Sequence, residues 1–276
     1  AANHFAGIKS ALRPVLGLAN LGHSVLGTKA MSCITKGMHN VLGIPLWTPA
    51  MPKAYSIKSS QLTIDNDTLR NKNADKDSLA NGQLKVVYFP SCINQTMGLP
   101  KKSPVEQALA SKMIALLQKG GYEVIFPENM EKLCCGTIWE SKGMLDIADR
   151  KSAELEAALW KASEQGRYPV LCDQSPCLHR MRETIHKMKL YEPAEFIYTF
   201  LRNRLVFTPT DRPVAVHITC SMRKMGLAGT HYSLGTSLLI QSHHTRRSRL
   251  LRLCRRPRLH ISRTERIRPA QNSAPR

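Results

Sequence analysis

Long apolar runs and several common catalytic motifs are missing from this sequence of 276 residues. No run of 18 or more apolar residues occurs, so we expect no membrane-spanning helix. No glycine-rich phosphate loop, Ser/His/Asp set or HExxH motif is present, so no motif indicates the corresponding nucleotide-binding or hydrolytic classes. The chain starts at Ala1 without an initiator Met and without the pattern of a secretory signal, so we expect it to be the interior of a longer chain.

Acidic residues are scarce, above all near the C-terminus. The sequence has 40 Lys and Arg against 20 Asp and Glu, a net charge of +20 that ordinarily indicates a polyanionic partner. Residues 1–227 hold 19 Lys, 10 Arg and 19 acids, whereas residues 228–276 hold 11 Arg, no Lys and one acid. Half of the net charge therefore lies in the last 49 residues, so the total of +20 does not describe the protein as a whole.

We interpret residues 228–276 as a disordered, aberrant tail. Three features stop together near Ala228: the use of Lys, the apolar periodicity and the pattern of an apolar run that ends in Cys. Their joint end indicates a shifted reading frame or a similar truncation. The alternative is a genuine Arg-rich arm that binds nucleic acid or anionic lipid.

Alternating strands and helices predict an α/β fold with a parallel sheet. Apolar, β-rich runs predict four strands, at 85–90, 122–126, 168–172 and 213–218. Helical spacing predicts intervening helices at 104–120, 144–164, 179–189 and 193–202. Before them we expect a helical linking subdomain over 1–55, broken at Pro14 and in the region Gly17 to Gly27, and a polar linker over 56–83.

Cysteine carries the strongest signal. Five of the eight cysteines follow predicted strands directly or in the next loop: Cys92, Cys134, Cys135, Cys172 and Cys177. Because the carboxyl ends of parallel strands meet at one edge of a sheet, we expect these thiols to converge. Adjacent cysteines make a strained disulfide but serve well as thiolate ligands, and Gly136 after them permits a tight turn.

An iron–sulfur cluster is the interpretation that we favour for these five cysteines. A zinc site, a dithiol redox pair and inert buried thiols remain alternatives, although zinc sites more often use C-x2-C pairs. We expect Cys33 to be a small apolar residue in a helix and Cys254, in the tail, to have no role. No catalytic residue is predicted.

Four segments resemble the cysteine-rich CCG module that heterodisulfide reductases share with the iron–sulfur component of glycolate oxidase. They are Tyr88–Cys92, Leu133–Gly136, Leu171–Cys177 and His217–Ser221. The likeness is greatest to the C-terminal half of fused FAD and iron–sulfur D-lactate dehydrogenases, and Pro45–Pro52 resembles their joining segment. It covers about residues 1 to 227, with one module at 84–212 and the truncated start of a second at 213–227.

The resemblance implies a cluster of the 4Fe-4S type, bound by the five cysteines named above, that relays electrons from flavin to a quinone or cytochrome. It implies a flavin-containing dehydrogenase portion as partner, with FAD outside this sequence, so the fragment alone is expected to be inactive on D-lactate or another 2-hydroxy acid. It also implies a cytoplasmic location, with peripheral association at the inner face of the cytoplasmic membrane. No nucleic-acid partner is expected. Cys172 and Cys177 are separated by four residues, where many members have two. The other interpretation is a zinc-binding or metal-free interaction module with a polyanion-binding tail.

Overall fold

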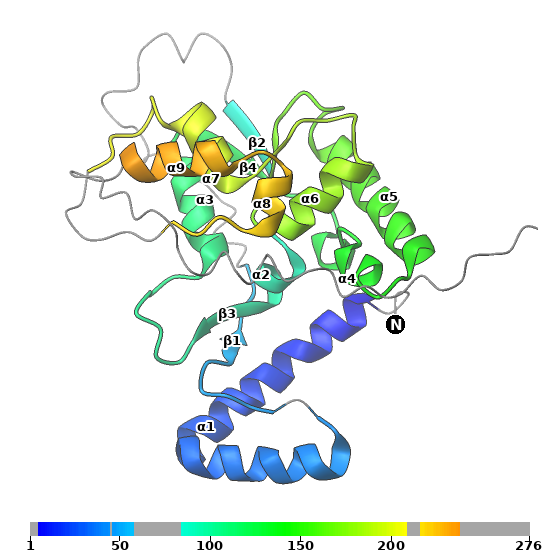
Figure 1. Ribbon diagram of the computed structural model, residues 1–276, viewed down its shortest axis with the longest axis vertical. Helices are drawn as coiled ribbons and strands as arrows, with labels where there is room; N and C mark the ends of the chain where they lie inside the picture. The colour runs from blue at the N-terminus through cyan, green and yellow to red at the C-terminus, as the bar shows by residue number, and fades with distance from the viewer. Residues whose placement is uncertain (1–4, 45, 58–83, 209–215, 238–276) are drawn as a thin grey trace, which may run out of the picture.

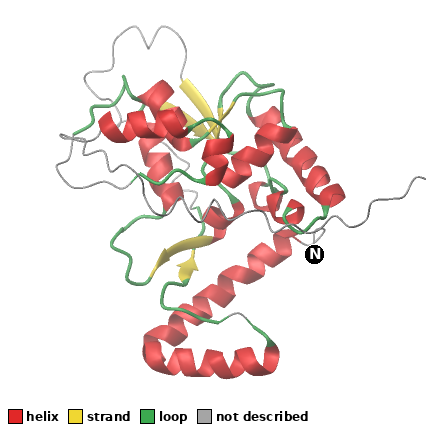
Figure 2. Ribbon diagram, in the orientation of Figure 1, coloured by secondary structure: helices red, strands yellow, loops and turns green. Residues whose placement is uncertain are grey.

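A small parallel sheet with helices around it forms the centre of this computed structural model, which describes residues 5–44, 46–57, 84–208 and 216–237 (Figure 1). The strands of the sheet are β2 (Leu84–Phe89), β4 (Tyr122–Ile125), β5 (Val170–Cys172) and β6 (Leu190–Tyr191). They lie in the order β4-β2-β5-β6, and each neighbouring pair is parallel. Figure 2 shows the helices on the two sides of these strands. The predicted α/β class is confirmed at this level.

Burial of both faces explains why β5 and the last four residues of β2 are uninterrupted apolar runs. Successive side chains of β2 point to opposite faces. Val87 and Phe89 belong to the core cluster that contains residues of α5 (Leu145–Ala162) and α6 (Ser175–Thr184). Val86 and Tyr88 belong to the cluster on the other face, with α3 (Leu109–Lys119) and α7 (Pro193–Phe196). A short π-helical turn, labelled η5 (Ile197–Leu201), continues α7.

Helix α1 (Phe5–Leu42) differs from the expected series of short helices. Pro14 lies inside it without ending it, whereas Gly27 has a non-helical φ of 75° and ψ of 175°. Glycine tolerates this positive φ because it has no Cβ. Gly27 divides α1 into a first arm, residues 5–26, and a second arm, residues 28–42, which run in different directions in Figure 1. Trp47, which follows the second arm, is buried and packs on His23 with ring centroids 4.7 Å apart.

A second, two-stranded sheet was not predicted from the sequence. It pairs β1 (Pro52–Ala54) with β3 (Met97–Pro100) in antiparallel fashion. Strand β1 contacts α1, and β3 directly follows α2 (Cys92–Thr96). The N-terminal segment is therefore joined to the parallel-sheet part through this ribbon rather than standing apart from it.

The prediction of a strand at 213–218 is wrong for residues 216–218, which form no strand, and residues 213–215 lie outside the described part. The place beside β5 belongs to β6, with Val170 opposite Leu190 and Leu171 opposite Tyr191. A strand of two residues is too short to show the alternation on which strand prediction depends.

The chain stays helical beyond the expected break at Ala228. Helix α8 (Cys220–Lys224) is followed by α9 (Ala228–Ser237), and α9 contacts α7. His231 Nε2 lies 2.9 Å from Glu192 Oε2, and Leu234 is buried. The disorder expected from Ala228 onward therefore does not describe these ten residues. Residues 238–276, the remainder of the predicted tail, and 58–83 of the predicted linker lie outside the described residues.

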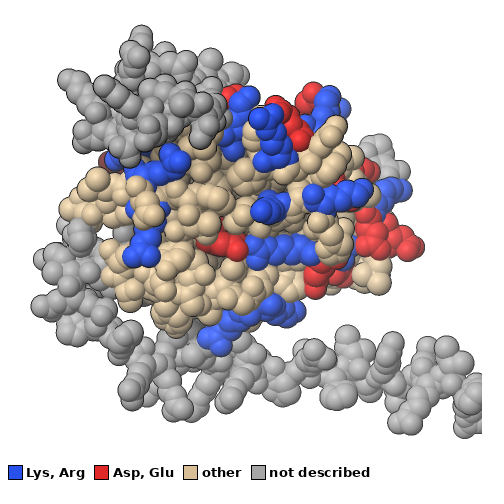
Figure 3. Space-filling view, turned by 90° about the horizontal axis from the view of Figure 1, so that it is seen from above, with Lys and Arg blue, Asp and Glu red and all other residues tan. Residues whose placement is uncertain are grey.

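Two further features concern the length of the helices and the charge of the surface. In the described ranges, no helix has both the length and the apolar character needed to cross a membrane. Figure 3 shows one face of the molecule, on which Lys and Arg side chains lie among Asp and Glu. The charge on this face is mixed, as it is over residues 1–227 of the sequence.

Candidate functional site

The five cysteines lie on three segments that follow β2, β4 and β5. Cys92 is the first residue of α2, Cys134 and Cys135 follow the turn η4 (Met130–Lys132), Cys172 ends β5, and Cys177 lies in α6. In the sheet order β4-β2-β5-β6, strand β2 lies between β4 and β5. The chain goes from β2 to β4 on one side and then crosses to β5 on the other side of β2. The carboxyl end of such a pair is where open α/β sheets bind their ligands.

A buried aspartate links the segments that carry Cys92 and Cys172. Asp173 Oδ1 accepts a hydrogen bond of 2.8 Å from the Ser91 backbone N–H, and its Oδ2 accepts one of 2.7 Å from the Tyr88 hydroxyl. Burial raises the pKa of Asp173, although both hydrogen bonds act in the opposite direction. Sequence reasoning missed this residue because its partners lie on another strand, and its only signal was its place directly after Cys172.

The turn Cys134-Cys135-Gly136 depends on its glycine. Gly136 has φ 90° and ψ −17°, and an added Cβ would lie 2.5 Å from the Ala148 carbonyl oxygen in α5. The Ser152 hydroxyl, also in α5, donates a 2.9 Å hydrogen bond to the Cys135 carbonyl oxygen. Helix α5 thus packs directly against the turn and positions Cys135. The expectation that Gly136 permits a tight turn is confirmed.

Three of the thiols interact with one another. The neighbouring thiols of Cys134 and Cys177 hold the pKa of Cys135 well below its usual range. Cys135, followed by burial, raises the pKa values of Cys134 and Cys177. The Cys135 thiol group also lies 3.3 Å from the Thr137 hydroxyl oxygen. Segments after two different strands therefore place their sulfur atoms together.

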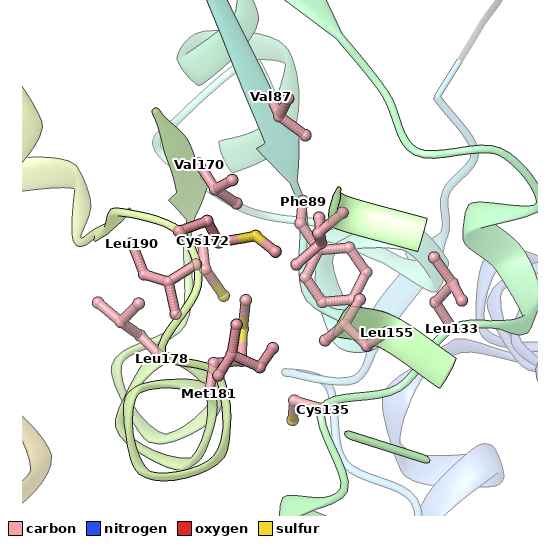
Figure 4. Packing of buried hydrophobic residues seen from close by; sticks show 13 residues of the cluster. Val87, Phe89, Leu133, Cys135, Leu155, Val170, Cys172, Leu178, Met181 and Leu190 are labelled. Atoms are coloured by element: carbon pink, nitrogen blue, oxygen red, sulfur yellow. The ribbon is translucent and has the colours of Figure 1, made fainter. Parts of the chain in front are cut away.

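Cys172 and Cys92 are electrostatic neighbours of the same thiols. Burial, then the negative charge of Asp173, then Cys135 and Cys92 raise the pKa of Cys172. Burial, then Cys135, raises the pKa of Cys92. Figure 4 shows Cys172 and Cys135 within one packed core cluster that also contains Phe89. All five predicted cysteines thus belong to one region of the structure.

Helix α1 reaches this region as well, which the sequence did not reveal. Lys9, in its first arm, is buried, and its Nζ donates a 2.6 Å hydrogen bond to Gln95 Oε1. Gln95 lies in α2, the helix that Cys92 begins, and its side-chain amide donates a 2.6 Å hydrogen bond to the Pro90 carbonyl oxygen. No sequence motif connects Lys9 with the distant cysteines, so only the packing of α1 brings them together.

The donor set suits a soft metal ion or an iron–sulfur cluster, since five thiols are available and thiolates are the preferred ligands of both. Within the described residues, however, no group of three or more His, Cys, Asp or Glu is already arranged to hold a metal ion. Comparisons with protein-family models, curated proteins and solved structures found no match to this chain.

Two further cysteines of the described residues, Cys33 and Cys220, are exposed. Cys33 lies in a helix, as expected, and is exposed on the second arm of α1. Cys220, expected to open a second module, begins α8 and is exposed. Cys254 lies outside the described residues.

Proposed function

We propose that this chain binds an iron–sulfur cluster of the 4Fe-4S type through Cys92, Cys134, Cys135, Cys172 and Cys177, and that the cluster relays electrons. The observation that supports this most directly is the gathering of these cysteines beside the carboxyl ends of β2 and β5. Cys134, Cys135 and Cys172 are buried, and burial is one of the means by which proteins tune cluster potentials.

The wider role rests on the resemblance of the cysteine motifs to flavin-linked D-lactate dehydrogenases. In such an enzyme the cluster would pass electrons from reduced flavin to a quinone or cytochrome, and a flavin-containing portion would oxidise the 2-hydroxy acid. This chain would supply the binding, orientation and electrostatic environment of the cluster. We therefore expect the chain alone not to oxidise D-lactate.

Anaerobic purification followed by assays of iron and acid-labile sulfide tests the cluster. We expect both elements in similar amounts, with most of each lost in Cys135→Ser because Cys135 is the thiol that Cys134 and Cys177 both contact. Cys33→Ser is the matched control, since Cys33 is exposed on the second arm of α1 and its replacement should leave the iron content unchanged.

Zinc gives the contrary result in the same assay. Stoichiometric zinc without sulfide would refute the proposed electron relay and support a zinc-stabilised interaction module instead. Equal iron loss in Cys135→Ser and Cys33→Ser would contradict the assignment of the ligands.

A further inference from the structure

The buried ammonium group of Lys9 has neutral hydrogen-bonding and aromatic partners. Lys9 is 6% exposed, its hydrogen bond goes to the Gln95 amide oxygen, and its Nζ lies 5.6 Å from the centre of the Phe5 ring. Among the described residues, no carboxylate forms an ion pair with it. A buried charge without an opposite charge is costly, so such a charge is normally paired.

Helix α1 contacts α2, which Cys92 begins, and η4, which precedes Cys134, so thiols of the cysteine site are the groups that can offer Lys9 negative charge. Burial lowers the pKa of Lys9, whereas Cys92, then Cys134 and Glu131 act in the opposite direction and favour its charged form. Arg13, one turn further along α1, donates a 3.1 Å hydrogen bond from Nη2 to the Gln95 carbonyl oxygen and adds a second positive charge nearby. Protonated thiols are neutral, whereas thiolates that bind a metal centre leave the site negative. The cations therefore match the metal-bound state of the cysteines.

We propose that Lys9 is the counter-charge of the cysteine site and that it raises the reduction potential of the centre bound there. Lys9 would act as a positioning residue rather than as a ligand. Reduction adds one electron to the centre, and a nearby positive charge in a buried site stabilises that added negative charge. The inference rests on the proposed function in that the cysteines must bind a cluster or a metal ion.

Redox titration of the cluster-loaded chain tests the inference. Lys9→Gln removes the charge and keeps a hydrogen-bond donor, whereas Lys9→Arg keeps the charge. Lys36→Gln is the matched control because Lys36 is exposed on the second arm of the same helix and its loss changes the net charge equally. We expect Lys9→Gln to shift the one-electron equilibrium about tenfold toward the oxidised form, which lowers the potential by about 59 mV. Lys9→Arg and Lys36→Gln should stay close to the wild-type potential.

Cobalt binding separates failure of this inference from failure of the proposed function. Co²⁺ that binds to several thiols displaces their protons and leaves the site negative, so Lys9→Gln should weaken the apparent Co²⁺ affinity of the reduced, cluster-free chain about tenfold relative to Lys36→Gln. This result without any iron–sulfur cluster would refute the proposed relay and keep the role of Lys9. An unchanged potential together with an unchanged Co²⁺ affinity in Lys9→Gln would overturn the role of Lys9 as counter-charge. A chain that binds neither an iron–sulfur cluster nor Co²⁺ would refute both proposals.

Folding of the variants is checked by far-ultraviolet circular dichroism before either titration. Should Lys9→Gln lose the wild-type spectrum, Lys9→Met takes its place, because Met fills a similar apolar volume without the charge. The same tenfold effects are expected of it, and their absence would overturn the inference equally.

Discussion

Gly136→Ala should destabilise the protein through two separable effects. The left-handed backbone at Gly136, with φ 90°, costs a residue with a side chain about 1 kcal/mol. The new Cβ would also lie 2.5 Å from the Ala148 carbonyl oxygen, a main-chain atom of α5 that cannot rotate away. Overpacking of this kind costs about 2 kcal/mol. We therefore expect the free energy of unfolding to fall by about 3 kcal/mol in total.

Gly143→Ala isolates the backbone effect in this comparison. Gly143 has φ 75°, and no atom lies within 4 Å of an added Cβ, so only about 1 kcal/mol should be lost. Urea unfolding followed by circular dichroism measures both variants. Gly136→Ala should also lower the yield of the proposed cluster, because the shifted turn carries Cys134 and Cys135. A loss of stability no larger in Gly136→Ala than in Gly143→Ala would refute the packing of α5 against the turn.

Three further predictions concern the hydrogen bonds and the core. Tyr88→Phe should cost about 1.5 kcal/mol at neutral pH because the buried Asp173 loses a donor. Burial raises the pKa of Tyr88, so the stability that this group contributes is present below about pH 10 and is lost as pH rises further. Urea unfolding of Tyr88→Phe should lack this loss. An equal pH dependence of the free energy of unfolding in the variant and the wild type would contradict the prediction. His231→Ala should speed hydrogen exchange in α9 but not in β2, and unchanged exchange in α9 would show that its contact with α7 is not stabilising. Leu155→Ala, at a fully buried position, should cost about 3 kcal/mol, whereas Leu18→Ala, at a 69% exposed position, should cost under about 0.5 kcal/mol in the same assay.

Strand prediction succeeded where the strands are buried on both faces. The runs at 85–90, 122–126 and 168–172 overlap β2, β4 and β5, and each is a short, mostly apolar stretch that ends at or near turn residues. The run at 213–218 has the same composition, but residues 216–218 form no strand. Composition shows that a segment can be buried, whereas it does not show which segment pairs with β5, and that place is taken by β6 (Leu190–Tyr191).

Helix breaks were predicted less well because local propensity and tertiary packing compete. Pro14 was expected to end a helix, yet α1 continues through it. The actual break falls at Gly27, within the region that the sequence marked as interrupted. Residues beyond Ala228 carry no Lys, but residues 228–237 still form a helix whose His231 meets Glu192.

The sequence by itself determined the α/β class and the set of thiols that meet, because strand periodicity and the position of each cysteine after a strand are local properties of the chain. It also determined the need for Gly136, since a tight turn after two adjacent cysteines requires an unusual backbone conformation. Only the tertiary structure decided what surrounds those thiols. Asp173 reaches Tyr88 and Ser91 across the sheet, and Lys9 arrives with a helix that is remote in sequence. Such contacts depend on how whole elements pack, and packing between distant segments leaves no periodic trace in the sequence.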